Sequence, residues 1–403
     1  MKVLKFGGTS VKNAENISKV IEIVRGDIYQ HEVLVVVSAF GGITNLLIET
    51  AQKAAKGDES YKALFNKISD AHAQVIEQLL SGDLRTQCES YIVEQLSNFK
   101  DILHGLYLLR ELSTRSLDLV SSFGERLSAY IIAHAFTAKG IPARYLDARE
   151  VIKTDKTFGA AKVNFEKTNT LIAQKVKNSN TLWIATGFIA STDDDETITL
   201  GRGGSDYSGA IFARALEASI LEIWTDVDGM MTADPRKVKK AYPISNITYS
   251  EAMELSHFGA KVLEPRTVIP AMAIGIPVLI KNTFNPTAPG TLITAQNEQS
   301  AHRVQGISSI DDISLITVQG SGMIGEAGIS MRLFRAIAKE SINVILITQG
   351  SSEHSITFAV LPKDALRSVE LLKQEFELEI KTNLIDDIKA EHNLAIVSAV
   401  GEN

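Results

Sequence analysis

The stretch that decides the fold is Val3-Leu4-Lys5-Phe6-Gly7-Gly8-Thr9-Ser10, a short apolar run that ends in a pair of glycines. We expect a strand at Val3–Phe6 and a helix at Asn13–Val24, so the glycines connect a strand to a helix. Glycines let a phosphate approach the backbone closely, and a helix N-terminus offers free N–H groups at its positive end. The spacing matches neither a Walker P-loop nor G-x-G-x-x-G, and it fits an ordinary strand-to-helix turn equally well.

Short apolar runs alternate with longer amphipathic stretches over the N-terminal two-thirds of the chain. The further expected strands are Val33–Ser38, Ala143–Asp147, Leu182–Thr186, Leu221–Thr225 and Pro277–Lys281. The further expected helices are several within Leu46–Ala138, then Asp206–Ala218 and Glu251–Leu255. Because the strands are almost continuously apolar, both faces of their sheet must be covered. We therefore expect an α/β fold with a mostly parallel sheet between helices, in which ligands bind beyond the carboxyl ends of the strands.

A second glycine-rich cluster, Gly201-Arg202-Gly203-Gly204-Ser205-Asp206, lies at the start of an expected helix. Ser205 is a candidate N-cap, and the carboxylate of Asp206 suits the positive end of the helix dipole. The planar guanidinium of Arg202 can form two hydrogen bonds with a carboxylate. A flexible turn is the alternative, but three glycines beside an arginine favour an anion-binding site.

The expected strand Leu221–Thr225 is followed by two carboxylates, Asp226 and Asp228, and then by Arg236. Carboxylates at such a position can hold a magnesium–nucleotide complex or a ribose, and an arginine can bind phosphate. An ordinary Asp-Gly turn explains the same residues.

Two further polar clusters, Ser38–Asn45 and Phe123–Arg126, adjoin apolar runs. The side chains of Glu125 and Arg126 are neighbours on an expected helix. From this pattern alone, a solvated ion pair is the favoured interpretation.

Composition and charge argue against several classes of protein. A formal net charge of −7 disfavours binding to nucleic acid or to an anionic membrane. Cys88 is the only cysteine, and the eight histidines show no metal-ligand spacing, so neither a disulfide framework nor a zinc site is expected. The longest apolar run, Val33–Phe40, is too short to cross a bilayer. We expect a cytoplasmic protein.

The C-terminal part has a different pattern. A first domain is expected at 1–285, a linker rich in proline and polar residues at 286–302, and a second domain at 303–390. The expected elements of the second domain are the strands Ile313–Val318, Val344–Gln349 and Ser355–Val360 and the helices Ile329–Glu340 and Asp364–Glu375. Their βαββα order indicates a small α+β unit.

A short internal repeat occurs near the end of the chain, where Ile396–Gly401 has the same pattern of apolar residues before a glycine as Leu315–Gly320. We interpret residues 391–403 as the start of a second unit of the same kind, and the chain as part of a longer protein.

Taken together, these segments resemble the aspartokinase family, which has the amino-acid-kinase fold. The matching segments are Lys5–Ser10, Ser38–Asn45, Phe123–Arg126, Gly201–Asp206, Trp224–Arg236, Glu251–Leu263 and Lys281–Thr283. Each is weak alone, but they follow the order of the family along essentially the whole chain. Residues from about Arg303 resemble a regulatory ACT domain with βαββαβ order. The segment Gln349–Glu353 resembles the form found in bifunctional aspartokinase–homoserine dehydrogenases.

The resemblance implies that the protein phosphorylates the side-chain carboxylate of L-aspartate, the first step towards lysine, threonine and methionine. The cofactor would be ATP with Mg²⁺, and the metal would be held mainly by the phosphates, without protein ligands. Threonine or lysine would act as feedback effector, with Gln349 as a candidate contact, and ACT domains would pair to form a homo-oligomer.

The resemblance also implies roles for individual residues. Lys5 would contact the transferred phosphoryl group, and Asp206 would be the second catalytic residue. The expected aspartate-binding residues are Ser38, Thr44, Glu125, Arg202, Gly204 and Ser205, with Glu125 on the ammonium and Arg202 on the α-carboxylate. The expected nucleotide-binding residues are Lys5, Gly7, Gly8, Thr9, Thr225, Asp226, Met231, Arg236, Lys261 and Val262.

Two positions depart from the family pattern. Met231 stands where a tyrosine is usual, which changes the packing expected at the adenine or ribose edge, and Glu264 stands where a histidine is common. Alternative functions are a kinase for another acidic substrate, such as acetylglutamate or glutamate, and an amino-acid sensor without catalysis. Glu125 discriminates between the substrates, because a free ammonium needs a carboxylate partner and an acetylated nitrogen does not.

Overall fold

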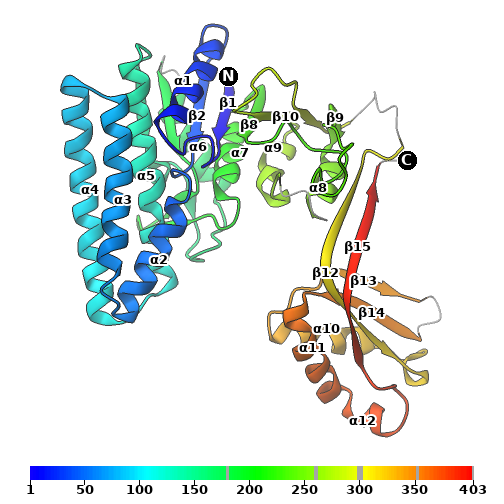
Figure 1. Cartoon of the computed structure of the whole chain (residues 1–403). Helices are drawn as coiled ribbons and strands as arrows, with labels where there is room; N and C mark the ends of the chain where they lie inside the picture. The colour runs from blue at the N-terminus through cyan, green and yellow to red at the C-terminus, as the bar shows by residue number, and fades with distance from the viewer. Residues whose placement is uncertain (178–180, 258–261, 297–302, 351–353, 402–403) are drawn as a thin grey trace. The chain divides into compact units, whose positions relative to one another are not determined.

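The computed structural model describes residues 1–177, 181–257, 262–296, 303–350 and 354–401, which form two compact units (Figure 1). The first unit comprises Met1–Gly306 together with the last residues from Val400 onward, and the second comprises Ile307–Ala399. Among the described residues, no helix combines the length and the apolar character that a bilayer span requires.

The first unit is built on an eight-stranded sheet with the strand order β3-β5-β2-β1-β8-β10-β11-β9. Its mutually parallel strands are β1 (Lys2–Phe6), β2 (Val33–Val37), β3 (Ala143–Leu146), β5 (Leu182–Thr186), β8 (Ile220–Thr225) and β10 (Val278–Asn282). The predicted parallel sheet is therefore confirmed, and β1 lies inside it between β2 and β8.

Two short strands at one edge of the sheet were not expected. β11 (Thr291–Thr294) runs antiparallel to β10, and β9 (Asn246–Thr248) pairs with β11. The hydroxyl of Thr291 donates to the carbonyl of Ile244 at 2.6 Å and accepts from the N–H of Met230 at 2.8 Å. Residues 291–294, which we expected in a linker, thus belong to the sheet of the first unit. Four residues are too few to give a clear period-two pattern.

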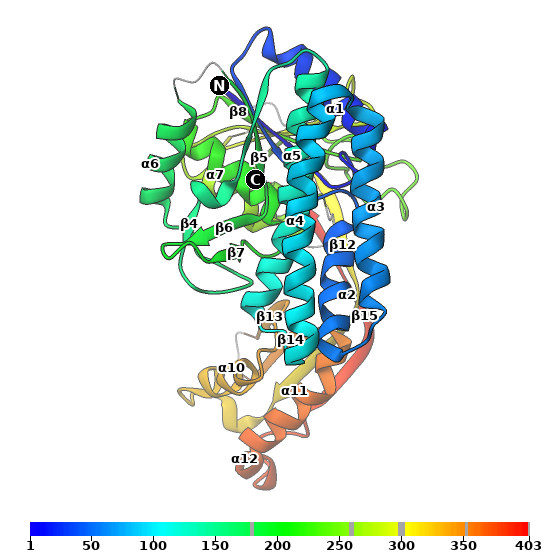
Figure 2. The ribbon, with the colours of Figure 1, turned by 90° about the vertical axis from the view of Figure 1, so that its left-hand side faces the viewer.

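Helices cover both faces of this sheet (Figures 1 and 2). One face is covered by α1 (Ala14–Ile28), α2 (Ile43–Lys56), α3 (Tyr61–Leu79), α4 (Gly82–Leu109) and α5 (Thr114–Ala138). The other is covered by α6 (Phe165–Val176), α7 (Gly204–Leu216), α8 (Tyr249–His257) and α9 (Ile269–Met272). In β1, Leu4 and Phe6 pack against the first group and Val3 against the second. Because side chains alternate along a strand, Lys5 lies on the same face as α7.

A small three-stranded sheet extends the first unit. It consists of β4 (Lys153–Thr154), β6 (Ile189–Thr192) and β7 (Thr197–Thr199), and β6 and β7 form an antiparallel hairpin. Figure 2 shows this sheet near the long helices, and β7 packs against α5. The hairpin leads directly into the glycine-rich segment before α7.

The second unit is a four-stranded sheet in the order β13-β14-β12-β15 with helices packed on it. Its elements are β12 (Gly306–Gln319), α10 (Ile329–Lys339), β13 (Leu346–Gln349), β14 (Ser355–Val360), α11 (Pro362–Glu375), α12 (Glu377–Lys381) and β15 (Lys389–Val400). The expected α+β unit with an ACT-like βαββαβ order is present.

The last strand corrects one expectation. Residues 391–400, which we interpreted as the start of a second unit, lie in β15, and β15 lies beside β12 in the sheet of the first such unit. The similarity between Ile396–Gly401 and Leu315–Gly320 therefore reflects two strands of one sheet, because neighbouring strands share the same apolar alternation.

The register of β11 can be tested with Thr291→Val. This change leaves the buried N–H of Met230 and the carbonyl of Ile244 without their partner, which is expected to lower the free energy of unfolding by about 1–3 kcal/mol. Thr294→Val is the matched control, because that hydroxyl bonds the carbonyl of Gln296 at an exposed position. Chemical denaturation that shows equal stability for both variants would contradict this register.

Candidate active site

The carboxyl ends of four neighbouring strands meet at one edge of the main sheet. β1 pairs with β2 on one side and with β8 on the other. In open α/β sheets, ligands bind in a crevice at the carboxyl ends of such strands. Hydrogen bonds join the segments that leave these strands: the N–H of Gly7 donates to Trp224 (3.1 Å), that of Ser38 to Phe6 (3.2 Å) and that of Gly187 to Val37 (2.9 Å). The first glycine pair, the Ser38 cluster and the Thr225–Asp226 segment are thereby neighbours.

Lys5 and Asp206 form an ion pair across this edge. Lys5 comes from β1 and Asp206 from the first turn of α7, and their side chains are only 7% and 16% exposed. The close approach needs a glycine, because a Cβ on Gly209 would lie 3.2 Å from the Cβ of Lys5. A Cβ on Gly7 would lie 3.6 Å from the Lys5 ammonium, so this charge lies next to the first glycine pair.

A pocket of about 310 Å³ opens beside this ion pair. The residues that line it are Gly8, Ser38, Ala39, Phe40, Gly41, Gly42, Thr44, Glu125, Phe188, Gly201, Arg202, Gly203, Gly204 and Ser205. All six residues expected to bind aspartate are among them, although they come from three separate segments. The hydroxyl of Ser38 donates to that of Ser205 at 2.8 Å, which ties two of these segments together.

Ser205 does not cap α7 as expected. The helix begins at Gly204, and the capping position is occupied by Gly203, whose φ of +70° lies in the left-handed region that favours glycine. The hydroxyl of Ser205, one residue inside the helix, accepts from Ser38 instead, and Ser205 lines the pocket.

Glu125 is a buried carboxylate at the wall of this pocket. Its Oε1 accepts from the N–H of Ala39 at 3.2 Å, while its Oε2 has no hydrogen-bond partner among the described residues. Burial raises the pKa of Glu125 to about 8, although the bond from Ala39 and the charge of Lys5 oppose this shift. The solvated pair favoured from the sequence pattern is wrong, because Glu125 is 3% exposed and Arg126 packs over the ring of Phe123.

Arg202 is the most exposed charged group of the pocket. Its side chain is 83% exposed, and its Nε lies 3.6 Å from a carboxylate oxygen of Glu264. Such a long, solvated contact is weak, so the guanidinium can exchange Glu264 for a bound carboxylate at little cost. Glu125 and Arg202 thus present a carboxyl group and a guanidinium to one cavity, which suits the ammonium and the carboxylate of an α-amino acid.

The expected nucleotide-binding residues are less closely grouped. Thr225 ends β8 and donates to the carboxylate of Asp226 at 3.3 Å. Arg236 forms a two-bond fork with Asp234, at 3.0 and 2.8 Å, which lowers the pKa of Asp234 to about 2. Of the expected nucleotide-binding residues that the structure describes, those that do not line the 310 Å³ pocket are Lys5, Gly7, Thr9, Thr225, Asp226, Met231, Arg236 and Val262. Their roles stay predictions, and Lys261 lies outside the described residues.

Several residues of the site were missed from the sequence. Phe40 and Phe188 both line the pocket. Phe188 has a φ of +66°, which is unusual for an aromatic residue, and its N–H donates to the hydroxyl oxygen of Ser208 at 2.9 Å. It follows β5 as Ser38 follows β2, so its position at the carboxyl end of an expected strand was the available signal.

The second unit holds a pocket of about 320 Å³. Its lining residues are Met323, Gly325, Glu326, Ala327, Gly328, Ile329, Ser330, Gln349 and Ile356. Gln349, the expected effector contact, thus lies at a cavity between the end of β13 and the start of α10, whereas Ser351, Ser352 and Glu353 lie outside the described residues.

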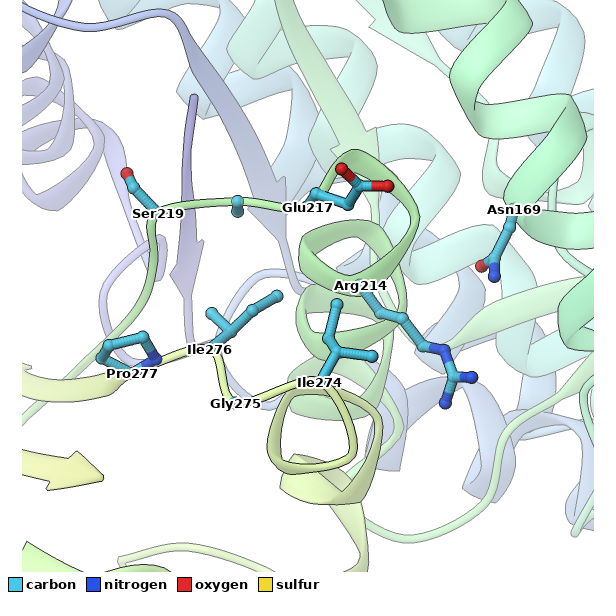
Figure 3. Close-up of a pocket in the computed structure, with 9 residues that line it drawn as sticks. Asn169, Arg214, Glu217, Ser219, Ile274, Gly275, Ile276 and Pro277 are labelled. Carbon is cyan, nitrogen blue, oxygen red and sulfur yellow. The ribbon is translucent and has the colours of Figure 1, made fainter. Parts of the chain in front are cut away.

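A larger pocket, of about 560 Å³, lies at the opposite edge of the main sheet (Figure 3). Ser219 and Pro277 in its wall precede β8 and β10, so it opens at the amino ends of strands. It contains none of the residues expected in a site, and its size alone does not mark it as the active site.

Two family models match the chain. The amino acid kinase family matches residues 1–282, and an ACT domain matches residues 316–376. These ranges lie mainly in the first and in the second unit, respectively.

Similar proteins extend this finding. Bifunctional aspartokinase/homoserine dehydrogenase 2, chloroplastic, from Arabidopsis thaliana is 36% identical over 99% of this chain and 44% of its own length. The chain thus spans about half the length of the bifunctional relatives that it matches. Aspartokinase 1, chloroplastic, from the same plant is 32% identical over 99% of the chain and 70% of its own length. The crystal structure of E. coli aspartokinase III with aspartate and ADP superposes with a TM-score of 0.82 at 31% identity, covering 100% of this chain and 87% of that one.

The environment of Glu125 predicts how stability depends on pH. Its pKa is about 8 in the folded chain against an ordinary 4.5, so the unfolded chain loses this proton first and stability declines as pH rises between these values. Glu125→Gln removes this loss, and the Tm of the variant should exceed that of the wild type by a margin that grows from about pH 5 to about pH 8.

Glu264→Gln is the matched control, because it changes a more exposed carboxylate beside Arg202. Its Tm difference from the wild type should stay nearly constant with pH. A constant difference for Glu125→Gln as well would show that burial does not hold the Glu125 carboxyl group in its protonated form.

Proposed function

Because this chain belongs to the aspartokinase family, we propose that it transfers the terminal phosphoryl group of ATP to the side-chain carboxylate of L-aspartate. One observation carries the proposal: the carboxyl group of Glu125, whose Oε2 has no partner among the described residues, and the guanidinium of Arg202 line one pocket beside the ion pair of Lys5. A pocket with these two groups recognises a free α-amino acid by its two charges.

In the proposed complex, Glu125 binds the ammonium through its free oxygen and Arg202 forks onto the α-carboxylate. Thr44 and the hydroxyls of Ser38 and Ser205 bind the remaining polar atoms of aspartate, and Gly204 lets the start of α7 pack closely against Phe188 in the pocket wall. An N-acetylated substrate has no ammonium and would leave the Glu125 carboxylate buried without a partner. This favours aspartate over acetylglutamate.

The chemistry requires positioning more than acid–base catalysis. The side-chain carboxylate of aspartate is already an anion at neutral pH, so no base is needed to create the nucleophile. One of its oxygens attacks the γ-phosphorus, the bond from that phosphorus to the bridging oxygen breaks, and ADP leaves with the electron pair. Two anions must therefore meet in line, and cations must spread the charge of the transition state.

Lys5 supplies a protein cation at this position. Its ammonium is paired with Asp206 and lies next to Gly7. The segment Gly7–Thr9 is the proposed phosphate-binding turn, with the N–H groups of Gly8 and Thr9 as contacts, because that of Gly7 donates to Trp224. Asp206 holds the ammonium in place until the phosphoryl group arrives. The Mg²⁺ ion that accompanies ATP is proposed to be bound mainly by the nucleotide phosphates.

The nucleotide is proposed to extend from Lys5 towards the end of β8. The residues proposed to bind it there are Thr225, Asp226, Met231, Arg236, Lys261 and Val262. To bind a phosphate, the guanidinium of Arg236 would have to break its two hydrogen bonds to the carboxylate of Asp234.

We also propose that the second unit binds an amino-acid effector at the pocket that contains Gln349. E. coli aspartokinase III has been solved in complex with lysine and aspartate, so lysine is one candidate and threonine the other. Pairing of ACT-like units into a homo-oligomer and a cytoplasmic location complete the proposal.

Trapping of the acyl phosphate with hydroxylamine tests the proposed activity. ATP, Mg²⁺ and a panel of acidic amino acids should give hydroxamate with aspartate, and Lys5→Ala should lower kcat about a hundredfold or more while the KM for aspartate changes little. Lys19→Ala, which removes an exposed lysine from α1, is the matched control and should keep the wild-type kcat.

Two outcomes would contradict this account. Hydroxamate formation with another acid but not with aspartate would favour a different carboxylate kinase. Binding of ATP and aspartate without turnover would favour an amino-acid sensor, and a near-normal kcat for Lys5→Ala would remove Lys5 from the catalytic role.

A further inference from the structure

Asp118 is a buried carboxylate on α5 that holds two separate segments of backbone. It is 4% exposed. Its Oδ2 accepts from the N–H of Gly159 at 2.8 Å and from the N–H of Thr199 at 3.1 Å, and its Oδ1 accepts from the hydroxyl of Thr199 at 2.7 Å. Hydrogen bonds to a charged, buried acceptor are stronger than those between neutral groups, so this contact fixes both segments against the helix.

Both segments adjoin the loop that carries Arg202, one along the chain and the other by packing. Thr199 is the last residue of β7, directly before the glycine-rich cluster. Gly159 packs against that cluster from the other side, because a Cβ on Gly201 would lie 3.0 Å from the carbonyl of Gly159. Asp118 therefore contacts the two pieces of backbone between which the base of the Arg202 loop is held.

The same helix carries Glu125. Asp118 and Glu125 are about two helical turns apart, so they lie on the same side of α5, and both are buried. One rigid element thus holds the group proposed to bind the substrate ammonium and, through Asp118, the base of the loop proposed to bind the α-carboxylate.

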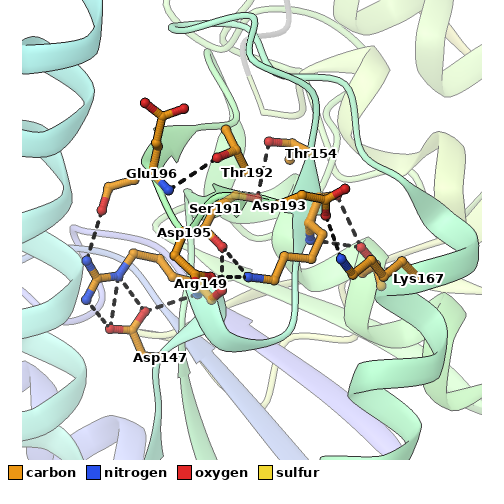
Figure 4. A network of polar contacts seen from close by, with 12 residues as sticks. Asp147, Arg149, Thr154, Lys167, Ser191, Thr192, Asp193, Asp195 and Glu196 are labelled. Carbon is orange, nitrogen blue, oxygen red and sulfur yellow. Dashed lines mark hydrogen bonds and ion pairs between the residues drawn. The ribbon is translucent and has the colours of Figure 1, made fainter.

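The turn of the hairpin β6–β7 also forms ion pairs. Figure 4 shows its acidic residues beside cationic side chains. Asp195 pairs with Lys153 at 2.7 Å, and Glu196 pairs with Arg115 of α5 at 3.1 Å. One side chain of each pair is exposed, Asp195 in the first and Arg115 in the second, so water and salt weaken both pairs. Asp118 adds buried hydrogen bonds to the packing of β7 against α5.

We propose that Asp118 is a positioning residue that sets the distance between Glu125 and Arg202 and thereby the fit of an α-amino acid. The inference rests on the proposed function. Asp118 does not line the substrate pocket, and it acts through the backbone of Thr199 and Gly159.

The test compares Asp118→Ala with Asp118→Asn in steady-state kinetics of the full chain. The alanine variant loses all three bonds and should raise the KM for aspartate about tenfold or more, because small displacements of a binding group are costly. The kcat at saturating aspartate and the KM for ATP should stay within about twofold of the wild type.

The asparagine variant should restore the KM for aspartate. Its amide oxygen can accept from the N–H groups of Gly159 and Thr199, and its NH₂ group can donate to the hydroxyl of Thr199. Thr168→Val is the matched control, because it removes another buried hydroxyl that accepts a backbone N–H, that of Lys153 at 3.0 Å, without touching the Arg202 loop.

If Asp118→Ala does not fold, Thr199→Val provides the second variant, since it removes only the bond to Oδ1 and should raise the KM for aspartate by a smaller factor. A proportional change of kcat and of both KM values, matched by Thr168→Val, would overturn the positioning role in favour of general stability. If the wild type turns over aspartate but Asp118→Ala and Thr199→Val leave the KM for aspartate unchanged, the positioning role of Asp118 is wrong, while the proposed function is not contradicted. Absence of aspartate-dependent turnover in the wild type would overturn the proposed function as well.

Discussion

The site depends on one costly feature, a buried carboxyl group that has no ion-pair partner among the described residues. Glu125 lines the pocket and accepts a hydrogen bond from the N–H of Ala39, and its second oxygen has no partner in the described part of the chain. Burial disfavours its ionised form strongly, so the empty pocket keeps a proton there near neutral pH. A ligand with a positive charge removes this penalty. The unfavourable environment of Glu125 in the empty protein is thus the physical basis for selecting a free ammonium group.

The remaining parts of the site bring anions together around this group. The central place of β1 in the sheet puts Lys5 between the neighbouring strand ends, and Asp206 on α7 keeps its ammonium directed there. Arg202 extends from a glycine-rich loop and makes only a weak contact with Glu264. Lys5 and Glu125 are buried on a strand and a helix, whereas the Arg202 side chain is exposed.

Much of the fold followed from local patterns. The parallel strands were predictable because each is a short apolar run, and the order of the glycine clusters placed them at one sheet edge. β11 and β15 were misassigned, since strand pairing depends on distant partners such as Ile244 for Thr291. The burial of Glu125 was not visible in its own segment, because the residues that enclose it come from β2 and α7. Its role came from family resemblance, whereas Phe188 and Asp118, whose partners are also distant, were not found.

Calorimetry of aspartate binding tests the central claim most directly. If the ammonium of aspartate binds the ionised form of Glu125, binding at about pH 7 must release about one proton from a group with a pKa near 8. The observed binding enthalpy should therefore vary with the ionisation enthalpy of the buffer, and Glu125→Gln should abolish that variation. An enthalpy that is the same in every buffer for the wild-type chain would contradict the claim that Glu125 exchanges its proton for the substrate ammonium.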